Sequence, residues 1–187
     1  SLPAREREEA TALAARIGIP LEVLETNELE DERYAANDGD RCYWCRRALV
    51  DALAPWARER GASLVYGAVP DDLGDDRPGM RAAEEGGLRA PLIEVGLAKD
   101  QVRELARRAG LPVWNKPAAA CLASRVPKGM RVSRDKLARI EAAEEVLHDH
   151  GFRVARVRDH EEIARIELDP EEMPRLADPE LRQAVVA

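Results

Sequence analysis

Short apolar runs alternate with amphipathic helical patterns along the first two thirds of this chain, and this alternation constrains the fold more than any other feature. The helical patterns span residues 3–17, 43–60 and 99–109, and strand-like runs lie between them at residues 19–25 and 63–67. Strands that alternate with helices usually pair in parallel. The sequence therefore predicts an α/β fold with a parallel sheet, in which residues 63–67 form a buried strand. Pro55 should kink the second helix or divide it in two.

The organisation changes in the last third of the chain. Ser133 can cap a helix over residues 134–150, and two alternating strands follow at residues 152–158 and 163–168. This succession predicts a second, small α+β unit. The predicted domains are residues 1–130 and residues 131–187.

Composition argues against two kinds of partner. No apolar run among the 187 residues is long and uncharged enough to span a membrane, and no signal peptide is visible, so we expect a cytoplasmic protein. A net charge of −7 counts against a protein that binds nucleic acid over a large part of its surface.

The cysteine count bears on chemistry. An odd number of cysteines, three, favours metal-binding or catalytic thiols over a disulfide framework.

The three cysteines carry the clearest chemical signal. Cys42 and Cys45 are spaced so that both sulfurs lie on one side of the first turn of a helix, and Cys121 can complete a three-thiolate site from a distant loop. Structural zinc is an alternative, with a fourth ligand taken from His148, His150 and His160. Cys121 by itself could also be a buried apolar residue, although its neighbours are polar.

Six short motifs together resemble one enzyme family. In chain order they are Arg41-Cys42-Tyr43-Trp44-Cys45, Tyr66-Gly67, Asp71-Asp72-Leu73-Gly74-Asp75, Arg77-Pro78-Gly79, Lys116-Pro117 and Cys121-Leu122-Ala123-Ser124-Arg125. The combination resembles the LarE family of ATP-dependent sulfurtransferases. The family has the parallel-sheet PP-loop fold of the adenine nucleotide alpha-hydrolases, and the resemblance covers nearly the whole chain.

The resemblance implies an enzyme that transfers sulfur to a pyridinium biscarboxylic acid mononucleotide, in building the nickel-pincer nucleotide cofactor of lactate racemase. Because oxide is a poor leaving group, ATP first converts the carboxylate into an acyl-adenylate, and sulfur then displaces AMP. Cys121 is the implied catalytic residue. Asp72 and its neighbour Asp71 would lie near the nucleotide and position Mg²⁺, although in an arbitrary chain they would be a solvated acidic turn.

A pocket for the substrate phosphate is also implied by the resemblance. Its residues would be Ser124, Arg125, Arg156 and Arg158, and Glu144 on a nearby helix would face the same pocket. Guanidinium groups suit this role because their planar fork matches phosphate geometry. Without the resemblance, two arginines spaced two residues apart on a strand would simply indicate the solvent-exposed face of a sheet.

Two mechanisms are compatible with these cysteines. Family members with one cysteine give up its sulfur and are left with dehydroalanine, so the protein is used once and needs no metal. Members with three cysteines hold a 4Fe-4S cluster whose fourth iron has no protein thiolate and can carry sulfide. The presence of Cys42 and Cys45 beside Cys121 favours the cluster mechanism.

One part of the resembling family has no match here. A Ser-Gly-Gly-x-Asp-Ser loop should cradle the ATP pyrophosphate, and none is present. We therefore expect a fragment lacking both ends, which alone binds ATP poorly. The resemblance further implies a homo-oligomer. Alternative functions are another PP-loop ligase, either a tRNA thiolase or an amidotransferase, and a non-catalytic zinc-stabilised module; the net charge of −7 speaks against tRNA.

Overall fold

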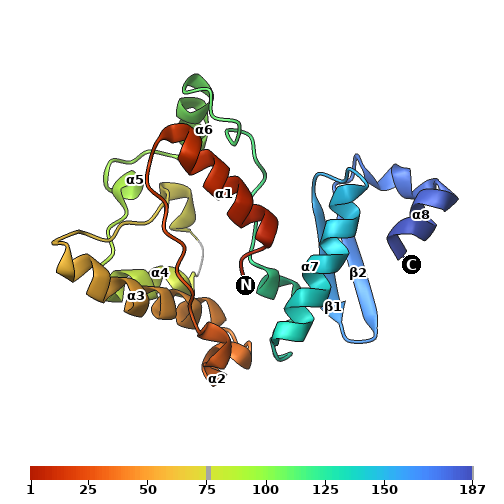
Figure 1. Ribbon diagram of the computed structural model, residues 1–187, viewed down its shortest axis with the longest axis horizontal. Coiled ribbons are helices and arrows are strands. Elements are labelled where there is room, and N and C mark those ends of the chain that lie inside the picture. Colours follow the sequence, from red (N-terminus) through yellow and green to blue (C-terminus); the bar gives the residue numbers. More distant parts are fainter. Residues whose placement is uncertain (75–76, 187) are drawn as a thin grey trace. The chain divides into compact units, whose positions relative to one another are not determined.

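The computed structural model describes residues 1–74 and 77–186, which form two compact units. The cysteine-pair unit is Ala12–Lys116, and the hairpin unit joins Ser1–Thr11 to Pro117–Ala187 (Figure 1). Helix α1 (Ala4–Ile17) runs across this division. The predicted division into domains, residues 1–130 and 131–187, stays a prediction. No helix in the described part of the chain is long and apolar enough to cross a membrane.

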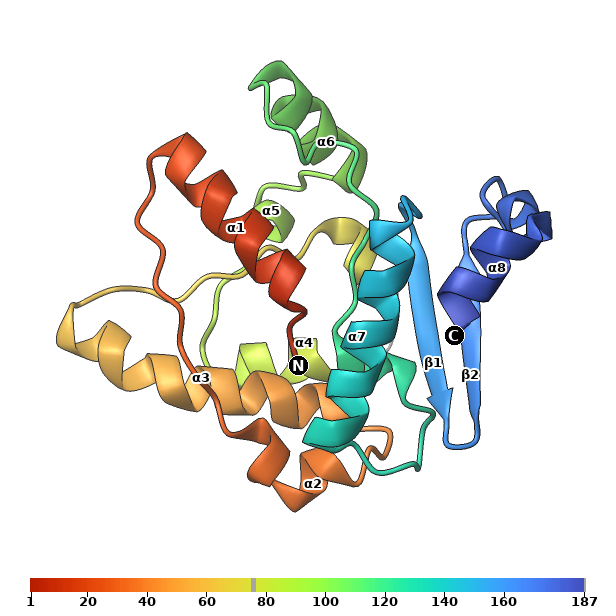
Figure 2. The same ribbon diagram turned by 45° about the vertical axis from the view of Figure 1, so that its right-hand side comes forward.

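Two helices of the cysteine-pair unit lie against each other. Helix α3 (Arg41–Glu59) and helix α4 (Pro78–Glu85) lie side by side in both views (Figures 1 and 2). They pack so closely that a side-chain carbon added to Gly86 would lie 2.6 Å from the buried side chain of Val50. The remaining elements of this unit are η1 (Glu28–Glu30), α2 (Glu32–Ala35), η2 (Pro70–Asp72), α5 (Pro91–Glu94) and α6 (Lys99–Arg108).

Pro55 does not divide α3, because one helix of 19 residues runs through it; of the two predicted outcomes, the division is wrong and the kink stays a prediction. The proline lies on the exposed side of the helix. There water can hydrate the carbonyl that the missing N–H leaves without a helical partner, which limits the cost of proline inside a helix.

The strand-like runs of the cysteine-pair unit do not form the predicted parallel sheet within the described residues. Residues 19–25 form no ladder there, and residues 63–67 contribute one parallel bridge, between Val65 and Arg89. Tyr66 N–H donates to the Arg89 carbonyl at 3.0 Å, and Arg89 N–H donates to the Leu64 carbonyl at 3.0 Å. Val65 is 58% exposed, so the prediction of a buried strand is wrong. A parallel ladder needs neighbours on both sides and both faces covered, and a single bridge supplies neither.

The hairpin unit matches its sequence prediction closely. Ser133 caps α7 (Arg134–Asp149) by accepting a hydrogen bond from Lys136 N–H at 3.3 Å. Strands β1 (Ala155–His160) and β2 (Ile163–Leu168) pair antiparallel from one end to the other, with α7 packed against β1 (Figure 2). Glu161, with φ of +67°, occupies the two-residue turn, so the hairpin is tighter than the predicted turn over residues 159–162.

An apolar cluster holds α7 and the hairpin together. Leu147, Phe152, Ala155 and Val157 are all buried in it. Alternate residues of β1 face inward, so Arg156 and Arg158 lie together on the opposite face, as the sequence predicts. The other elements of this unit are η3 (Leu122–Arg125), η4 (Met173–Ala177) and α8 (Pro179–Val186).

Candidate functional site

The cysteine pair lies on the first turn of α3, as its spacing predicts. Cys42 is exposed and Cys45 is half-buried, and neither is in a disulfide. The loop that leads into the helix is held by Asn37, which is buried with φ of +57°. Asn37 Oδ1 accepts a hydrogen bond from Arg41 Nη1 at 2.6 Å. Because asparagine tolerates this left-handed backbone better than most residues, its side chain can fix the start of the helix that carries the thiols.

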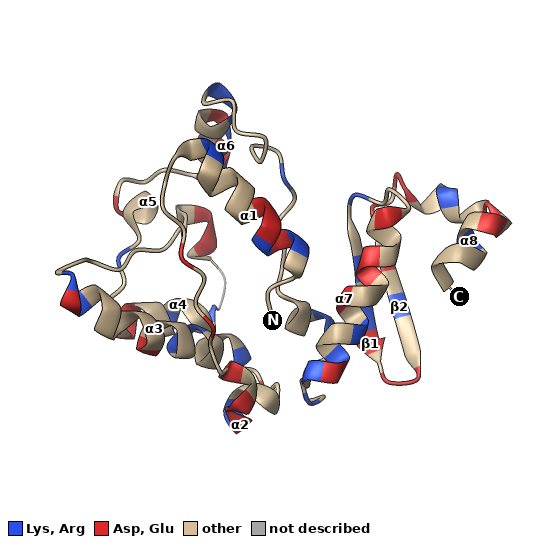
Figure 3. Cartoon of the chain, viewed as in Figure 1, with Lys and Arg blue, Asp and Glu red and all other residues tan. Residues whose placement is uncertain are grey.

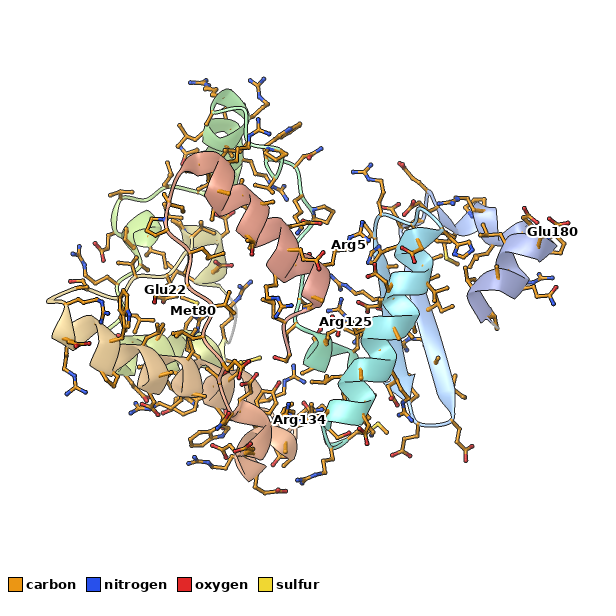
Figure 4. The ribbon with its side chains drawn as sticks, viewed as in Figure 1. Arg5, Glu22, Met80, Arg125, Arg134 and Glu180 are labelled. Atoms are coloured by element: carbon orange, nitrogen blue, oxygen red, sulfur yellow. The ribbon has the colours of Figure 1, made fainter. Side chains whose placement is uncertain are left out.

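A pocket of about 470 Å³ opens beside Cys42. Its wall includes the residues that follow the Val65 bridge and the residues that begin α4. A side-chain carbon on Gly79 would lie 3.2 Å from the Cys42 carbonyl oxygen, so the two backbones approach without an intervening side chain. Met80, labelled in Figure 4, also lines the pocket. The lining residues are Cys42, Arg46, Tyr66, Gly67, Ala68, Asp72, Arg77, Pro78, Gly79 and Met80.

Charged groups on the pocket wall are partly engaged with each other. Asp72 accepts from Val69 N–H at 3.1 Å through Oδ2, and its Oδ1 lies 2.7 Å from Arg77 Nη1. The Arg46 guanidinium lies over the Tyr66 ring, 5.5 Å from its centroid. The two arginines make this pocket suitable for an anionic ligand.

The neighbouring acidic residues differ from Asp72 in their surroundings. Asp71 Oδ2 accepts from Lys99 N–H at 3.0 Å, so Asp71 serves as a cap at the start of α6. Asp75, which belongs to the resembling motif, and Asp76 lie outside the described residues.

Cys121 lies in the hairpin unit, immediately before η3, and is half-buried. Three donors converge on its carbonyl oxygen: Ser124 N–H at 3.0 Å, Ser124 Oγ at 2.8 Å and Arg125 Nη1 at 3.0 Å. This concentration of hydrogen bonds fixes the main chain of the residue predicted to carry the reactive sulfur.

Arg125 and Glu144 form a buried, bidentate ion pair. Arg125 Nε lies 2.8 Å from Glu144 Oε1 and Nη2 lies 3.0 Å from Oε2, and each side chain is only 7% exposed. Figure 4 labels Arg125 at the η3 turn beside α7. Glu144 Oε1 also accepts from Val157 N–H of β1 at 2.9 Å. One carboxylate therefore connects α7, β1 and the turn after Cys121.

Arg156 and Arg158 lie half-exposed on the open face of β1, and both reach toward the Cys121 stretch. Arg158 Nη1 donates to the Ser124 carbonyl at 3.3 Å, and Arg156 Nη2 donates to the Ala118 carbonyl at 3.4 Å. Basic residues of β1 and acidic residues of α7 are both visible in Figure 3. The hairpin unit thus brings together Cys121, Ser124, Arg125, Glu144, Arg156 and Arg158.

Sequence reasoning missed Glu167 on β2. Its carboxylate accepts from Arg158 Nε at 2.7 Å and from Arg165 Nη2 at 2.7 Å. The hydrogen bond from Arg158, followed by that from Arg165, holds the pKa of Glu167 below its usual value. The strand register pairs Glu167 with Arg156. The sequence did contain a signal for this residue. An acidic residue on the open face of β2 is a natural cross-strand partner for the arginines of β1.

The described residues contain no group of three or more His, Cys, Asp or Glu side chains arranged to hold a metal ion. Cys42 and Cys45 belong to one unit and Cys121 to the other, so three-thiolate ligation stays a prediction. Of the histidines considered for zinc, His148 and His150 each place Nδ1 2.8 Å from a main-chain carbonyl oxygen.

Comparison with known proteins gives three relatives, while no protein-family model matches. An uncharacterized protein of Synechocystis is 44% identical over 174 residues, which are 92% of this chain and 65% of the relative. The pyridinium-3,5-bisthiocarboxylic acid mononucleotide synthase of Lactiplantibacillus plantarum is 36% identical over 164 residues, 87% of this chain and 59% of the synthase. An uncharacterized protein of Methanocaldococcus jannaschii is 30% identical over 139 residues, 74% of this chain and 54% of the relative. The chain therefore spans between 54% and 65% of the length of these relatives.

Proposed function

The chain belongs to the LarE family, that of the Lactiplantibacillus plantarum synthase, and from this premise we propose that it performs ATP-dependent sulfur transfer to a pyridinium biscarboxylic acid mononucleotide. The observation that carries the proposal is the convergence, in the hairpin unit, of the Cys121 main chain with Ser124, Arg156 and Arg158. This arrangement supports a site in which the Cys121 thiol lies near groups that suit a phosphate.

Substrate recognition in this proposal rests on the open face of β1. The guanidinium groups of Arg156 and Arg158 hold the substrate phosphate, and the half-exposed Ser124 hydroxyl adds a polar contact. Both arginines already donate to carbonyls of the Cys121 stretch, so a phosphate bound to them lies near that stretch. The substrate carboxylate is thereby presented to the sulfur.

The chemical step begins after the carboxylate has been converted to an acyl-adenylate. A thiolate attacks the acyl carbon, a C–S bond forms, and the C–O bond to AMP breaks with AMP leaving. If the sulfur is that of Cys121, a base then removes its α-proton, the Cβ–S bond breaks, and the product thiocarboxylate leaves dehydroalanine behind. This route consumes the protein.

We favour a catalytic route in which Cys42, Cys45 and Cys121 hold a 4Fe-4S cluster. The donor set fits, since cysteine thiolates are the usual protein ligands of such clusters, and two of the three lie on one helical turn. When bound, the cluster would supply an iron that lacks a protein ligand and can carry exchangeable sulfide. Cys121 then serves as a ligand and keeps its sulfur.

The pocket beside Cys42 is our proposed site for the adenine nucleotide. Its volume of about 470 Å³ falls within the usual range of small-ligand sites. Arg46 and Arg77 would face the phosphates, and Asp72 would position Mg²⁺ after exchanging Arg77 for the ion. In the proposed PP-loop fold, the bridge between Val65 and Arg89 would belong to the parallel sheet.

The test uses the full-length natural protein with ATP, Mg²⁺ and the mononucleotide, with and without anaerobic reconstitution by iron and sulfide. Several sulfurs transferred per reconstituted chain, with Cys121 intact by mass spectrometry, support the cluster route. One sulfur per chain with dehydroalanine at position 121 supports the sacrificial route. ATP-independent turnover, or no sulfur in the product, refutes the proposal.

A further inference from the structure

We propose that Arg125 and Glu144 are positioning residues: their buried ion pair fixes the Cys121 turn relative to the strand that carries Arg156 and Arg158. This role rests on the proposed sulfur transfer and deepens it, because it explains how the reacting sulfur and the phosphate-binding arginines keep a constant spacing. It differs from the expectation that both residues contact the substrate.

The hydrogen-bonding groups of the pair are used inside the unit. Arg125 Nη1 donates to the carbonyls of Ala120 at 2.6 Å and Cys121 at 3.0 Å, and lies 3.2 Å from Ser124 Oγ. Its Nε and Nη2 face Glu144. A buried ion pair is tolerated only where its remaining donors and acceptors are satisfied. Opening this one to reach a ligand would leave the Glu144 carboxylate buried without its guanidinium and would remove the Arg125 donor from the Ala120 carbonyl.

The geometry couples two parts of the proposed site through one atom. Glu144 Oε1 accepts from Arg125 Nε at 2.8 Å and from Val157 N–H at 2.9 Å. Val157 lies between Arg156 and Arg158 on β1, so its amide moves with the backbone that carries them. Because Arg125 holds the Cys121 carbonyl, a shift of Glu144 changes the position of the sulfur relative to the arginines. Misplacement of a reacting group by about 1 Å can reduce the rate about 100-fold.

A matched pair of double variants separates this role from simple stabilisation. The ion pair of Arg125 and Glu144 is called the brace below, and the brace variant is Arg125→Met with Glu144→Gln. It removes both members of the pair, so no unpaired charge stays buried and the protein can fold. Arg139→Met with Asp159→Asn removes an ion pair that joins α7 directly to β1 at an N···O distance of 2.8 Å and involves no residue of the Cys121 turn. Circular dichroism verifies folding of both variants of the full-length protein.

Steady-state kinetics gives the first readout. We expect the brace variant to lower kcat for sulfur transfer about 100-fold, with KM for the mononucleotide within about twofold of wild type. The control variant should keep wild-type kcat. An increase in KM with kcat preserved would instead make the two residues substrate ligands and overturn the proposal. Equal losses of kcat in both variants would also overturn it.

Alkylation of Cys121 gives a second readout that needs no activity. In metal-free protein under anaerobic conditions, iodoacetamide modification at Cys121 is followed by peptide mass spectrometry. We expect several-fold faster modification in the brace variant, because the turn that half-buries the thiol is released, and no change in the control. Unchanged alkylation in the brace variant overturns the positioning role. If wild-type protein transfers no sulfur, the proposed function fails, while the alkylation rates still decide whether the brace exists.

Discussion

The apolar cluster of the hairpin unit and the strand-like runs of the cysteine-pair unit differ in how completely their apolar residues are buried. In the hairpin unit, Leu147 and Phe152 are each 1% exposed. In the cysteine-pair unit, Ile19 is 55% exposed, Val23 is 60% exposed and Val65 is 58% exposed, and these three belong to the strand-like runs. An antiparallel hairpin finds its partner strand through a two-residue turn, whereas parallel strands need partners far away in sequence. The antiparallel pairing of β1 with β2, which are neighbours in sequence, is therefore complete. Parallel pairing between distant segments is limited to one bridge in the described residues.

The units also differ in how they hold the residues of chemical interest. Side chains surround the Cys121 turn, and a buried guanidinium binds its carbonyls. Beside Cys42, a side-chain carbon added to Gly79 would lie 3.2 Å from the Cys42 carbonyl oxygen, so the main chain at the start of α4 lies close to that of α3. The position of the Cys121 turn should therefore respond to substitutions that change charge. The position of Cys42 should respond to substitutions that change side-chain volume.

The largest expected effect separates the cysteines of the two units. Cys121→Ser should reduce sulfur transfer by a factor on the order of 10³ or more in either mechanism, because it removes the reacting sulfur or a cluster ligand. Cys42→Ala with Cys45→Ala should abolish iron incorporation and multiple turnover while leaving one sulfur per chain available from Cys121. Product and iron analysis of the full-length protein checks both. Full multiple turnover in the double variant would refute the cluster route.

A core substitution compares the packing of the units directly. Phe152→Ala should lower the free energy of unfolding by about 3–5 kcal/mol, since the ring is buried in the apolar cluster. Val65→Ala in the other unit should change it by about 0.5 kcal/mol or less, because Val65 is largely exposed. Urea unfolding followed by circular dichroism measures both. Similar losses would mean that Val65 is covered in solution.

Close packing within the cysteine-pair unit can be tested at one glycine. Gly86→Ala should cost about 1–3 kcal/mol, because the added carbon lies 2.6 Å from Val50 Cγ1 and a buried valine has little rotamer freedom. Gly74→Ala is the matched control, since no atom of the described residues beyond its chain neighbours lies within 4 Å of its added carbon. Thermal unfolding of the two variants gives the comparison. A neutral Gly86→Ala would show that α3 and α4 separate easily.

The smallest expected difference between the two units is in how much each contributes to the loss of folding stability in acid. We expect this contribution to come from the hairpin unit. Burial raises the pKa of Asp159, but hydrogen bonds from Glu161 N–H and Arg139, with the charges of Arg139 and Lys136, outweigh burial and hold the pKa below its usual value of 3.8. A depressed folded-state pKa contributes stability above the unfolded pKa and loses it as pH falls through the folded value. Asp159→Asn should therefore flatten the decline of stability below about pH 4.

Glu104 on α6 is the control for this titration. Hydrogen bonds from Arg107 and then Arg108 lower the pKa of Glu104 to about 2, yet the group is exposed and its ion pairs are screened by water. Glu104→Gln should leave the pH dependence of unfolding unchanged. If stability declined less steeply with falling pH in Glu104→Gln than in Asp159→Asn, the acid sensitivity would come from the cysteine-pair unit instead.

Local signals in the sequence predicted the hairpin unit well. Ser133 before an apolar helical pattern gave the start of α7, and alternation gave both strands and the shared face of Arg156 and Arg158. The spacing of Cys42 and Cys45 likewise placed them on the first turn of α3. Each of these features depends on neighbours a few residues away.

Features that depend on distant residues were beyond such reasoning. Nothing near Val65 in sequence shows whether a strand will cover it, and nothing near Arg125 shows that Glu144, nineteen residues later, will bury it. Resemblance named both residues for the substrate pocket, whereas they bond to each other, Arg125 also bonds to main-chain carbonyls, and Glu144 also accepts from the Val157 amide. Glu167 was missed because its role arises from the register of β2 against β1.

The contact between Gly79 and the Cys42 carbonyl has a consequence for variation of this protein. A side chain at position 79 would require the start of α4 and the first turn of α3 to separate by a few tenths of an ångström, which is enough to change sulfur-to-metal distances in the proposed cluster. Substitutions at this position therefore offer a graded means of adjusting where the two thiols lie without altering either cysteine. A relative with alanine there would be a natural experiment in cluster geometry.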